Sequence, residues 1–402
     1  MDVLRIIAYI LEVLLIAYFG FASLYVFIFA FAGVFKAPKR ARIMNRERKF
    51  AVLIPGYKED NVIVEVAKSA LEQEYPKDLF EVVVIADSFK RTTLEALQKL
   101  PITVLEVSFE KSTKSKALNK AMELLGDDYQ VALVLDADNI MERDFIGKVN
   151  DAFNKGYKVV QGHRVAKNTN TAFAVLDAIS EEVNNHIFRK GHRVLGLSSA
   201  LIGSGMAFDF HFFKKTMAQV NAVGGFDKEL ELKLLKDRNT IEYLADAYVL
   251  DEKVQKTDVF SNQRKRWLSA QFVYFGRFAA SGLKELFLRG NVDFADKVYQ
   301  MVSPPRILLL GMVVLITMGY LLFDVFFEAS RLLVSPLAWY LIFGMTVLSF
   351  LLAIPQKFYN AATLRAIWTL PKAFGVMFLS LFKLKGANKK FIHTQHGTIK
   401  SN

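Results

Sequence analysis

The sequence predicts a parallel α/β domain that is joined at both ends to membrane-spanning helices. Three observations support this fold class. Short apolar runs alternate with helical stretches over residues 50–139, and three longer apolar runs lie outside that region, at 5–35, 307–327 and 336–354. The chain of 402 residues is also 52% hydrophobic and 23% charged, a mixture that favours a soluble domain with membrane segments over a chain embedded throughout.

The first apolar run, 5–35, is long enough to span a membrane, since a helix needs ~20 apolar residues to cross the bilayer core. It has no small-residue cleavage site after a short apolar core, so we expect an anchor and not a removed signal peptide. The segment 36–49 that follows is dense in Lys and Arg. By the positive-inside rule this segment lies in the cytoplasm and the N-terminus lies outside.

The next part of the chain alternates expected strands with expected helices. The strands are 50–57, 80–88, 102–108 and 130–139, and the helices are 61–74, 92–100 and 114–125. The strands are continuous apolar runs, as expected where helices cover both faces of a parallel sheet. In such sheets ligands bind at the carboxyl ends of the strands. Three polar motifs fall there: Pro55-Gly56-Tyr57, Asp87-Ser88 and Asp136-Ala137-Asp138.

Two further spans are expected at 307–327 and 336–354, and three other segments have the pattern of amphipathic helices on the membrane surface, at 171–190, 267–290 and 370–390. Three spans place residues 36–305 and the C-terminal tail in the cytoplasm, with the chain in the cell membrane. The expected organisation is an N-terminal span (1–35), a cytoplasmic α/β domain (36–280), an interface segment (281–306), two spans (307–354), and an interfacial helix with a basic tail (355–402).

Composition excludes several kinds of site. The chain has no cysteine, which excludes disulfides and thiolate metal sites, and its six histidines show no zinc spacing. The net charge of +12 suits nucleic acid, anionic lipid or phosphorylated substrates. We expect no nucleic-acid partner, because the positive charge is concentrated beside the expected spans and has a topological explanation there.

Asp136 and Asp138 are the strongest candidates for a metal site. They flank one residue, so in extended backbone both side chains point the same way. Two carboxylates on one side repel each other unless a cation joins them, and oxygen ligands of this kind suit Mg²⁺ or Mn²⁺ bridging to substrate phosphates. The alternative is a turn-forming Asp pair at the end of a strand.

Two other segments have the composition of ligand-binding loops. Lys114, Lys116 and Asn119 begin an expected helix, where cations and a helix N-terminus attract phosphate, but on this segment alone a solvated basic helix end is the preferred interpretation. The glycines around Ser204 in 201–210 permit close backbone approach to a ligand, and a simple turn is the alternative.

The segment 223–237 begins a helix in which Asp227 is the expected N-cap. Glu229 and Glu231 follow, and either carboxylate could act as a general base on an acceptor hydroxyl. Acidic residues are also common in a first helical turn for reasons of the helix dipole alone.

The stretch 261–271 places a tryptophan after three cations. Positions three and four apart share a helix face, so we expect Gln263, Arg266 and Trp267 to lie together, where they could bind an anion and stack on a ring-shaped ligand at once. Arg264 and Lys265 are expected to turn away toward lipid headgroups. A membrane-surface anchor is the alternative role for Trp267.

Taken together, these motifs resemble those of the membrane-integrated family 2 glycosyltransferases, the inverting GT-A enzymes that include cellulose, hyaluronan and poly-N-acetylglucosamine synthases. The order of the motifs matches: VLIPGYKE, VVVIADS, KALN, VLDADN, GSGMAF, GGFDKELEL and QRKRW, between an N-terminal span and paired C-terminal spans. The most specific of them is Gln-x-x-Arg-Trp. The resemblance implies a GT-A, Rossmann-like nucleotide-sugar domain between membrane helices.

The resemblance also implies a role for each matching position. Nucleotide binding would involve Pro55, Tyr57, Glu59, Asp87 and Lys116. The donor diphosphate would contact Asp136 and Arg266, with the metal held chiefly by Asp138 and also by Asp136. The acceptor would be bordered by Ser204, Gly205, Gln263 and Trp267, with the ring of Trp267 stacked on the sugar.

The chain departs from the family pattern at the general base, because the family's Thr-Glu-Asp is absent. Counting back from the following Glu-Leu puts the base on Glu229, with Glu231 as the second candidate. The segment 389–396 resembles a segment that some members fold over the nucleotide, with Thr394 and His396 as contacts, or else it is a solvated basic tail. Three spans are too few for a polymer channel within one chain.

The expected activity is transfer of a sugar from a UDP-linked donor, with Mg²⁺ or Mn²⁺, to a glycan at the membrane, which forms a β-linked saccharide. A lipid acceptor is the rival within this class, and a non-catalytic subunit that binds nucleotide or glycan is the rival outside it. The expected partners are the donor, a glycan or lipid acceptor, membrane lipids, and further copies or accessory secretion subunits.

Overall fold

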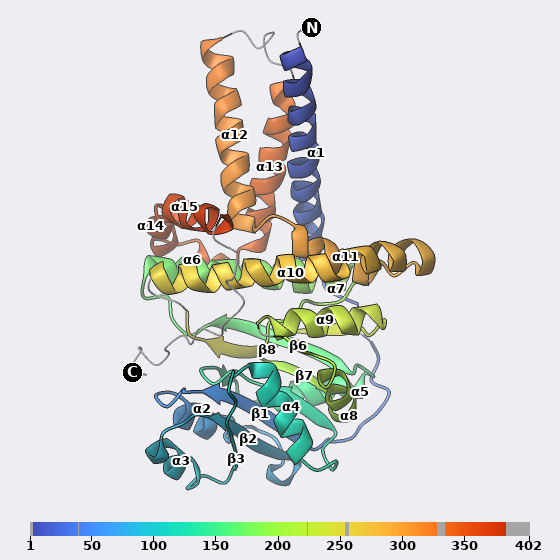
Figure 1. The fold of residues 1–402 in the computed structure, drawn as a ribbon, viewed down its shortest axis with the longest axis vertical. Coiled ribbons are helices and arrows are strands. Elements are labelled where there is room, and N and C mark those ends of the chain that lie inside the picture. The colour runs from blue at the N-terminus through green and yellow to red at the C-terminus, as the bar shows by residue number, and fades with distance from the viewer. Residues whose placement is uncertain (1–2, 39, 223, 254–256, 328–333, 383–402) are drawn as a thin grey trace.

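The computed structural model describes residues 3–382, apart from 39, 223, 254–256 and 328–333. Figure 1 shows three layers. Long helices stand at one end of the molecule, a layer of helices runs across their base, and an α/β domain with one sheet lies beyond that layer. The N-terminal end of the first helix lies far from the sheet, and the chain enters the domain from the opposite end of that helix.

The sheet has eight strands in the order β3-β2-β1-β4-β7-β6-β8-β5. Their bounds are Phe50–Tyr57 (β1), Phe80–Asp87 (β2), Thr103–Val107 (β3), Val131–Val134 (β4), Ile140–Met141 (β5), Val159–Ala166 (β6), Met206–Asp209 (β7) and Ile241–Asp251 (β8). The half formed by β1 to β4 is parallel, and β7 introduces antiparallel pairing with β4 and β6. The α/β prediction is therefore confirmed.

The expected strand 130–139 is too long, since β4 ends at Val134. The backbone N–H of Leu135 still donates to the carbonyl of Leu53 at 3.0 Å, and then the N–H of Asn139 donates to the carbonyl of Asp136 at 3.1 Å. The carboxylate pair therefore lies in a turn that leaves the sheet and not in extended backbone.

Helices cover both faces of the sheet and enclose two apolar cores. Their bounds are Ile63–Ala70 (α2), Arg91–Leu97 (α3), Lys114–Leu124 (α4), Phe145–Asn154 (α5), Phe210–Met217 (α8) and Phe226–Lys236 (α9), with a 3₁₀ turn at Lys77–Leu79. The first of these is shorter than the expected 61–74. The side chain of Thr113 caps α4 by accepting from the N–H of Lys116, as its residue type favours.

The expected cap of α9 is wrong by two residues. Gly225 occupies the N-cap position with a φ of 66°, and Asp227 lies inside the first turn. Glycine adopts this left-handed conformation without steric cost.

The middle layer holds α6 (Ala172–Asn184), a π-helical turn (Asn185–Gly191), α7 (His192–Val194), α10 (Thr257–Arg289) and α11 (Val292–Val302). The helices α14 (Ala361–Ile367) and α15 (Leu370–Leu381) lie at the base of the long helices beside α10, after a 3₁₀ turn at Gln356–Phe358 (Figure 1). The three segments predicted as amphipathic surface helices are thus helical over 172–184, 257–289 and 370–381. Their place at a membrane surface stays a prediction.

Three helices are long and apolar enough to cross a membrane: α1 (Val3–Ala32), α12 (Arg306–Phe326) and α13 (Pro336–Ala353). A fourth crossing would exist if α14 and α15, which meet at a 45° bend, formed one span. Ser23 and Thr346 join α1 to α13 through a buried hydroxyl hydrogen bond of 2.8 Å. Gly191 lets the middle layer approach α1 so closely that a Cβ there would collide with the carbonyl of Phe29.

Candidate active site

A cavity of ≈ 860 Å³ begins at the carboxyl ends of β1, β2 and β4. It passes between α6, α9 and α10 and reaches the base of the long helices at α12 and α13. Its size lies within the range of ~300–1,000 Å³ that small-molecule sites occupy. The cavity therefore connects the edge of the sheet where nucleotides bind in such folds to the apolar part of the molecule.

Four residues predicted for nucleotide binding line the end of the cavity at the sheet: Pro55, Tyr57, Glu59 and Asp87. The register of the parallel pair β1 and β2 places Tyr57 opposite Asp87. Lys58 and Ser88 follow them with φ angles of 56° and 60°, which turn both chains away from the sheet at the same edge. The Asp87 carboxylate is buried and accepts a 2.9 Å hydrogen bond from the Ser88 hydroxyl.

Asp136 and Asp138 also line the cavity. Ser204 fixes their turn from behind: its Oγ accepts from the N–H of Asp136 at 2.9 Å and donates to Asn139 Oδ1 at 2.6 Å. Asn139 in turn donates to Asp138 Oδ1 at 3.1 Å and to Asp251 Oδ1 at 2.9 Å. The turn is thus held on three sides, and the two carboxylates lie at the cavity wall.

The predicted place of Ser204 and Gly205 beside the acceptor is not what the structure shows. Ser204 is fully buried and its hydroxyl is used by the carboxylate turn, while neither residue lines the cavity. Gly205 has a φ of 61°, and a Cβ there would lie 2.9 Å from Val249 Cγ2. Gly203 is the residue of this loop that reaches the cavity.

The lysine beside the carboxylate pair is Lys114 and not the predicted Lys116. Lys114 Nζ donates to the Asp136 carboxylate and to the carbonyl of Gly203, the latter at 2.6 Å. Lys116 is exposed and donates to the carbonyl of Lys111 at 3.0 Å. Residues two apart on a helix lie on nearly opposite faces, so with Thr113 as the cap only the first lysine faces the sheet edge.

We expect Lys114→Met to raise the KM for a nucleotide sugar by about tenfold, because the ammonium beside the carboxylate pair is the closest cation to a bound diphosphate. Lys116→Met and Lys120→Met, on exposed positions of the same helix, should leave this KM unchanged. Steady-state release of the nucleoside diphosphate measures all three. A larger effect of Lys116→Met than of Lys114→Met would restore the assignment predicted from the sequence.

The carboxylate of α9 that lines the cavity from its first turn is Asp227. Glu229, the predicted base, is buried away from the cavity, 3.4 Å from Lys233 Nζ, 3.5 Å from the Tyr274 hydroxyl and 3.8 Å from Arg277. The expectation that Glu229 faces the acceptor is therefore not met. Glu229 lies two residues beyond Asp227 on α9, and residues two apart on a helix lie on nearly opposite faces.

Glu231, the second candidate base, does line the cavity but is already paired. Its carboxylate lies 2.6 Å from Lys297 Nζ of α11. Burial raises the pKa of Glu231, and the positive charge of Lys297 opposes this shift. Lys297 therefore already occupies the Glu231 carboxylate, and Asp227 is the candidate base that we carry forward.

The helix α10 brings Gln263, Arg266 and Trp267 to the cavity together, as the helical spacing predicts. Burial lowers the pKa of Arg266 from its usual range. Arg264 does not turn away toward lipid, which corrects the expectation made for it. Its guanidinium pairs with Asp177 of α6 and lies 4.5 Å from the ring centroid of Trp267.

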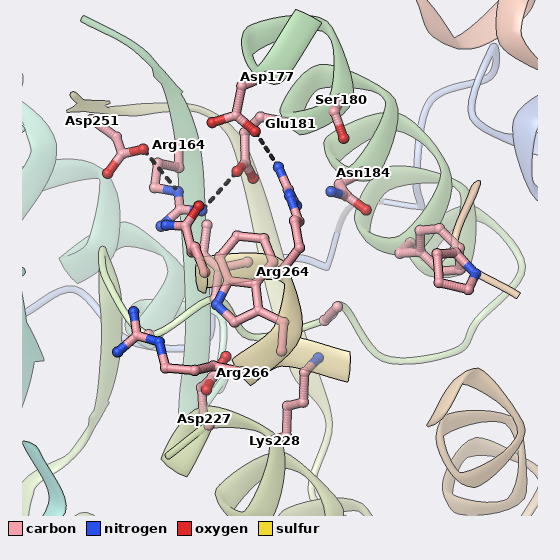
Figure 2. Close-up of a pocket in the computed structure, with 18 of the residues that line it drawn as sticks. Arg164, Asp177, Ser180, Glu181, Asn184, Asp227, Lys228, Asp251, Arg264 and Arg266 are labelled. Atoms are coloured by element: carbon pink, nitrogen blue, oxygen red, sulfur yellow. Dashed lines mark hydrogen bonds and ion pairs between the residues drawn. The ribbon is translucent and has the colours of Figure 1, made fainter. Parts of the chain in front are cut away.

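Figure 2 shows which helices build this part of the cavity. The labelled residues on helices are Asp177, Ser180, Glu181 and Asn184 from α6, Asp227 and Lys228 from α9, and Arg264 and Arg266 from α10, while Arg164 and Asp251 belong to strands β6 and β8. Acidic side chains of α6 therefore face the basic side chains of α10, and this pairing could not be read from 261–271 alone.

A buried ion-pair network that the sequence reasoning missed forms another wall. Arg164 NH2 at the end of β6 donates to Glu181 at 2.7 Å, and Lys253 Nζ donates to Asp251 at 2.7 Å. Burial alone would raise the pKa of Asp251, but the charges of Arg164 and Lys253 lower it. The sequence contains one signal for this wall: Asp251 stands at the end of an apolar run, as Asp87 does.

The structure brings two carboxylates, Asp136 and Asp138, to the place where a donor diphosphate would lie. Over the residues described, no group of three or more His, Cys, Asp or Glu side chains is arranged to hold a metal ion. A pair of carboxylates still fits Mg²⁺ or Mn²⁺, which commonly keep waters and take further ligands from substrate phosphates. Thr394 and His396, the remaining predicted contacts, lie outside the described residues.

A mixed sheet with a carboxylate pair at its carboxyl edge, a neighbouring lysine and an Arg-Trp pair from a covering helix defines a nucleotide-sugar glycosyltransferase of the GT-A fold. The sequence profile of the family described as "Glycosyltransferase like family 2" matches residues 47–270, more than half of the chain. The chain belongs to glycosyltransferase family 2.

Comparison with individual proteins agrees with this assignment. The chain is 25% identical over 263 residues to the "Probable glycosyltransferase YdaM" of Bacillus subtilis, a match covering 61% of each chain. It is 26% identical over 231 residues to the "Beta-monoglucosyldiacylglycerol synthase" of Nostoc sp., covering 54% of this chain and 47% of that one. These matches span less than two thirds of either relative.

The fold is similar to that of the mannosyltransferase PcManGT from Pyrobaculum calidifontis, whose structure is a complex with GDP-Man and Mn²⁺. The TM-score is 0.51 at 16% sequence identity, and the match covers 89% of this chain and 97% of that one. The predicted fold class, a GT-A domain between long apolar helices, is confirmed. The narrower resemblance to the cellulose, hyaluronan and poly-N-acetylglucosamine synthases stays a prediction.

Proposed function

We propose that this chain is a membrane-bound inverting glycosyltransferase that moves a sugar from a nucleotide diphosphate donor to a hydroxyl of a membrane-associated acceptor. One observation carries the proposal: a continuous cavity joins the carboxylate pair at the sheet edge to Asp227, Arg266 and Trp267 beneath the long helices. Donor and acceptor could therefore meet without leaving the protein. Membership of the family favours an enzyme over a non-catalytic binding subunit.

In this proposal the nucleotide lies against Tyr57 and Asp87, and the diphosphate lies beside Lys114. Asp136 and Asp138 would hold Mg²⁺ or Mn²⁺, which neutralises charge on the leaving diphosphate when bound. Arg266 adds a fixed positive charge near the same group, and such preorganised charges stabilise the transition state in a site from which water is excluded. We take the donor to be UDP-linked, as the resemblance implies.

Asp227 is the proposed general base, in place of Glu229. Its carboxylate takes the proton of the acceptor hydroxyl while that oxygen forms a bond to the anomeric carbon. The bond from this carbon to the diphosphate breaks on the opposite side, and its electron pair stays on the diphosphate oxygen. The anomeric configuration is inverted, so an α-linked donor gives a β-linked product.

Topology and domain limits follow the same proposal. In this proposal the end of α1 and the α/β domain lie in the cytoplasm, where nucleotide sugars are available, and the basic segment 36–49 supports this orientation through the positive-inside rule. The domain is taken as 36–280, with the middle-layer helices α6 and α10 at the membrane surface. The sugar is then added on the cytoplasmic side.

The proposal is tested with the purified full chain, Mn²⁺ and a panel of labelled UDP- and GDP-linked sugars in the presence of membrane lipids. We expect release of the nucleoside diphosphate from one donor together with transfer of its sugar. Failure of every donor to bind or react would contradict the proposed function. A GDP-linked donor used in preference would correct only the nucleotide.

A further inference from the structure

The end of the cavity nearest the long helices has an apolar wall. Side chains from five helices form it: Phe173 and Leu176 of α6, Leu310 of α12, Phe350 of α13, Ile367 of α14 and Met377 of α15. A sugar chain placed here would leave its hydroxyls without hydrogen-bond partners, which is costly. A hydrocarbon chain fits this wall, and the helices α12 and α13 are those apolar enough to lie in a membrane.

Two cations of the cavity wall have no acidic partner. Among the described residues, no carboxylate forms an ion pair with Arg306 or Lys228, whereas six other lining cations each pair with one: Lys114, Arg164, Arg189, Lys253, Arg264 and Lys297. Arg306 donates to the Asn184 side-chain amide, and its guanidinium lies 5.2 Å from the ring centroid of Phe188. Burial lowers the pKa of Lys228. Both cations are half-buried, and charges withdrawn from water are normally paired, so an anionic ligand would complete this wall.

The positions of these cations relate the anion to the reaction. Lys228 directly follows Asp227, and both line the cavity from the first turn of α9. Arg306 is the first residue of α12, at the boundary between the cavity and the apolar helix. An anion held here would therefore lie between the proposed base and the apolar wall, where the headgroup of a lipid would lie.

We propose that the acceptor is a lipid whose headgroup carries both a phosphate and a free hydroxyl. Its chains lie along the apolar wall, its phosphate contacts Arg306 and Lys228, and its hydroxyl reaches Asp227. This inference rests on the proposed function and narrows the acceptor to one class. The headgroup oxygen loses its proton to Asp227 and bonds to the anomeric carbon, the nucleoside diphosphate leaves, and the lipid phosphate is unchanged.

The test uses the full chain in phosphatidylcholine vesicles with Mn²⁺ and the labelled sugar donors. Four additions are compared: phosphatidylglycerol or phosphatidylinositol, which have phosphate, hydroxyl and chains; diacylglycerol, which lacks phosphate; glycerol 3-phosphate, which lacks chains; and a polyprenyl phosphate, which lacks the hydroxyl. We expect a labelled lipid product only from the first. Equal or greater transfer to any of the other three, or to an added oligosaccharide, would overturn the proposal.

Variants test the two cations separately. Arg306→Gln and Lys228→Gln should each raise the KM for the phospholipid by about tenfold, with a far smaller change in the KM for the donor. Arg306→Lys should restore part of the affinity, because it keeps the charge. Lys236→Gln, an exposed position on the same helix α9, is the matched control and should match the unaltered chain. Equal KM values for the phospholipid in all four variants would overturn the assignment.

A binding measurement separates this inference from the proposed function. Phosphatidylglycerol should raise the thermal unfolding midpoint of the full chain more than diacylglycerol does, and Arg306→Gln should remove that difference even if no donor reacts. A chain that reacts with a donor but shows the same midpoint with both lipids would retain the proposed function and lose the phospholipid acceptor.

Discussion

Replacing the proposed base by its amide, Asp227→Asn, is expected to lower kcat for sugar transfer by roughly 10²–10⁴-fold, the range that general-base catalysis contributes. Asparagine has nearly the same shape and still lines the cavity, but it cannot take the proton of the acceptor hydroxyl. The KM for the donor should change little, because the proposal has the diphosphate contact the carboxylate pair and Lys114 and not Asp227. Steady-state transfer with a labelled donor measures both constants.

Glu229→Gln is the matched control on the same helix. Its carboxylate lies among Lys233, Tyr274 and Arg277 and not at the cavity, so kcat should stay within about threefold of the unaltered enzyme. The opposite pattern, with Glu229→Gln inactive and Asp227→Asn active, would return the base to the position counted from the sequence. If Glu231→Gln were the only inactive variant of the three, the general base would be Glu231, the carboxylate that forms an ion pair with Lys297.

Much of the fold could be predicted because it depends on long, regular apolar patterns. The strands 50–57 and 80–87 and the helix 114–124 begin where the pattern places them. The error at 130–139 has a local cause: apolar and acidic residues continue, yet Asp136 begins a turn whose geometry depends on Ser204, 68 residues later. A pattern of residue types does not contain such a distant contact.

The candidate site was predicted well as a set of motifs and less well as individual side chains. Residues at strand ends were correctly placed at the cavity, since the register of parallel strands fixes them. On helices, an error of two residues reverses the face. This explains why Lys114 replaces Lys116, and why Asp227 reaches the cavity instead of Glu229. In both helices the two residues lie two positions apart, in α4 after the Thr113 cap and in α9 after the Gly225 cap.

Contacts between segments that lie far apart in the sequence account for the features of the site that were not predicted. Arg264 lies at the cavity because α6 supplies Asp177, 87 residues earlier in the chain. The wall formed by Arg164 and Asp251 joins β6 to β8, which neighbour each other only in the folded sheet. Residue spacing within α10 is enough to predict that Arg266 and Trp267 share a face. The environment of Arg264 depends on the neighbouring helix α6.

The second large effect is expected at the proposed metal site. Asp138→Ala should lower transfer by about 10³-fold or more, because a divalent cation stabilises the charge that develops on the leaving diphosphate by several kcal/mol. Donor affinity gives a readout independent of turnover. Calorimetry on the unaltered chain should show tighter binding of the nucleotide sugar with Mn²⁺ than without it, and the variant should bind equally weakly in both conditions.

Asp246→Ala, an exposed aspartate of β8, is the control and should keep both the activity and the effect of Mn²⁺.

The result for Asp138→Ala decides between two explanations of the carboxylate pair. If Asp138 only terminates a strand, its removal should change stability while the effect of Mn²⁺ on donor binding persists. If it is a metal ligand, that effect disappears although the turn is still held by the bonds from Ser204 to Asp136 and Asn139. Loss of activity with an intact effect of Mn²⁺ would contradict the metal assignment, since the defect would then lie in the geometry of the turn.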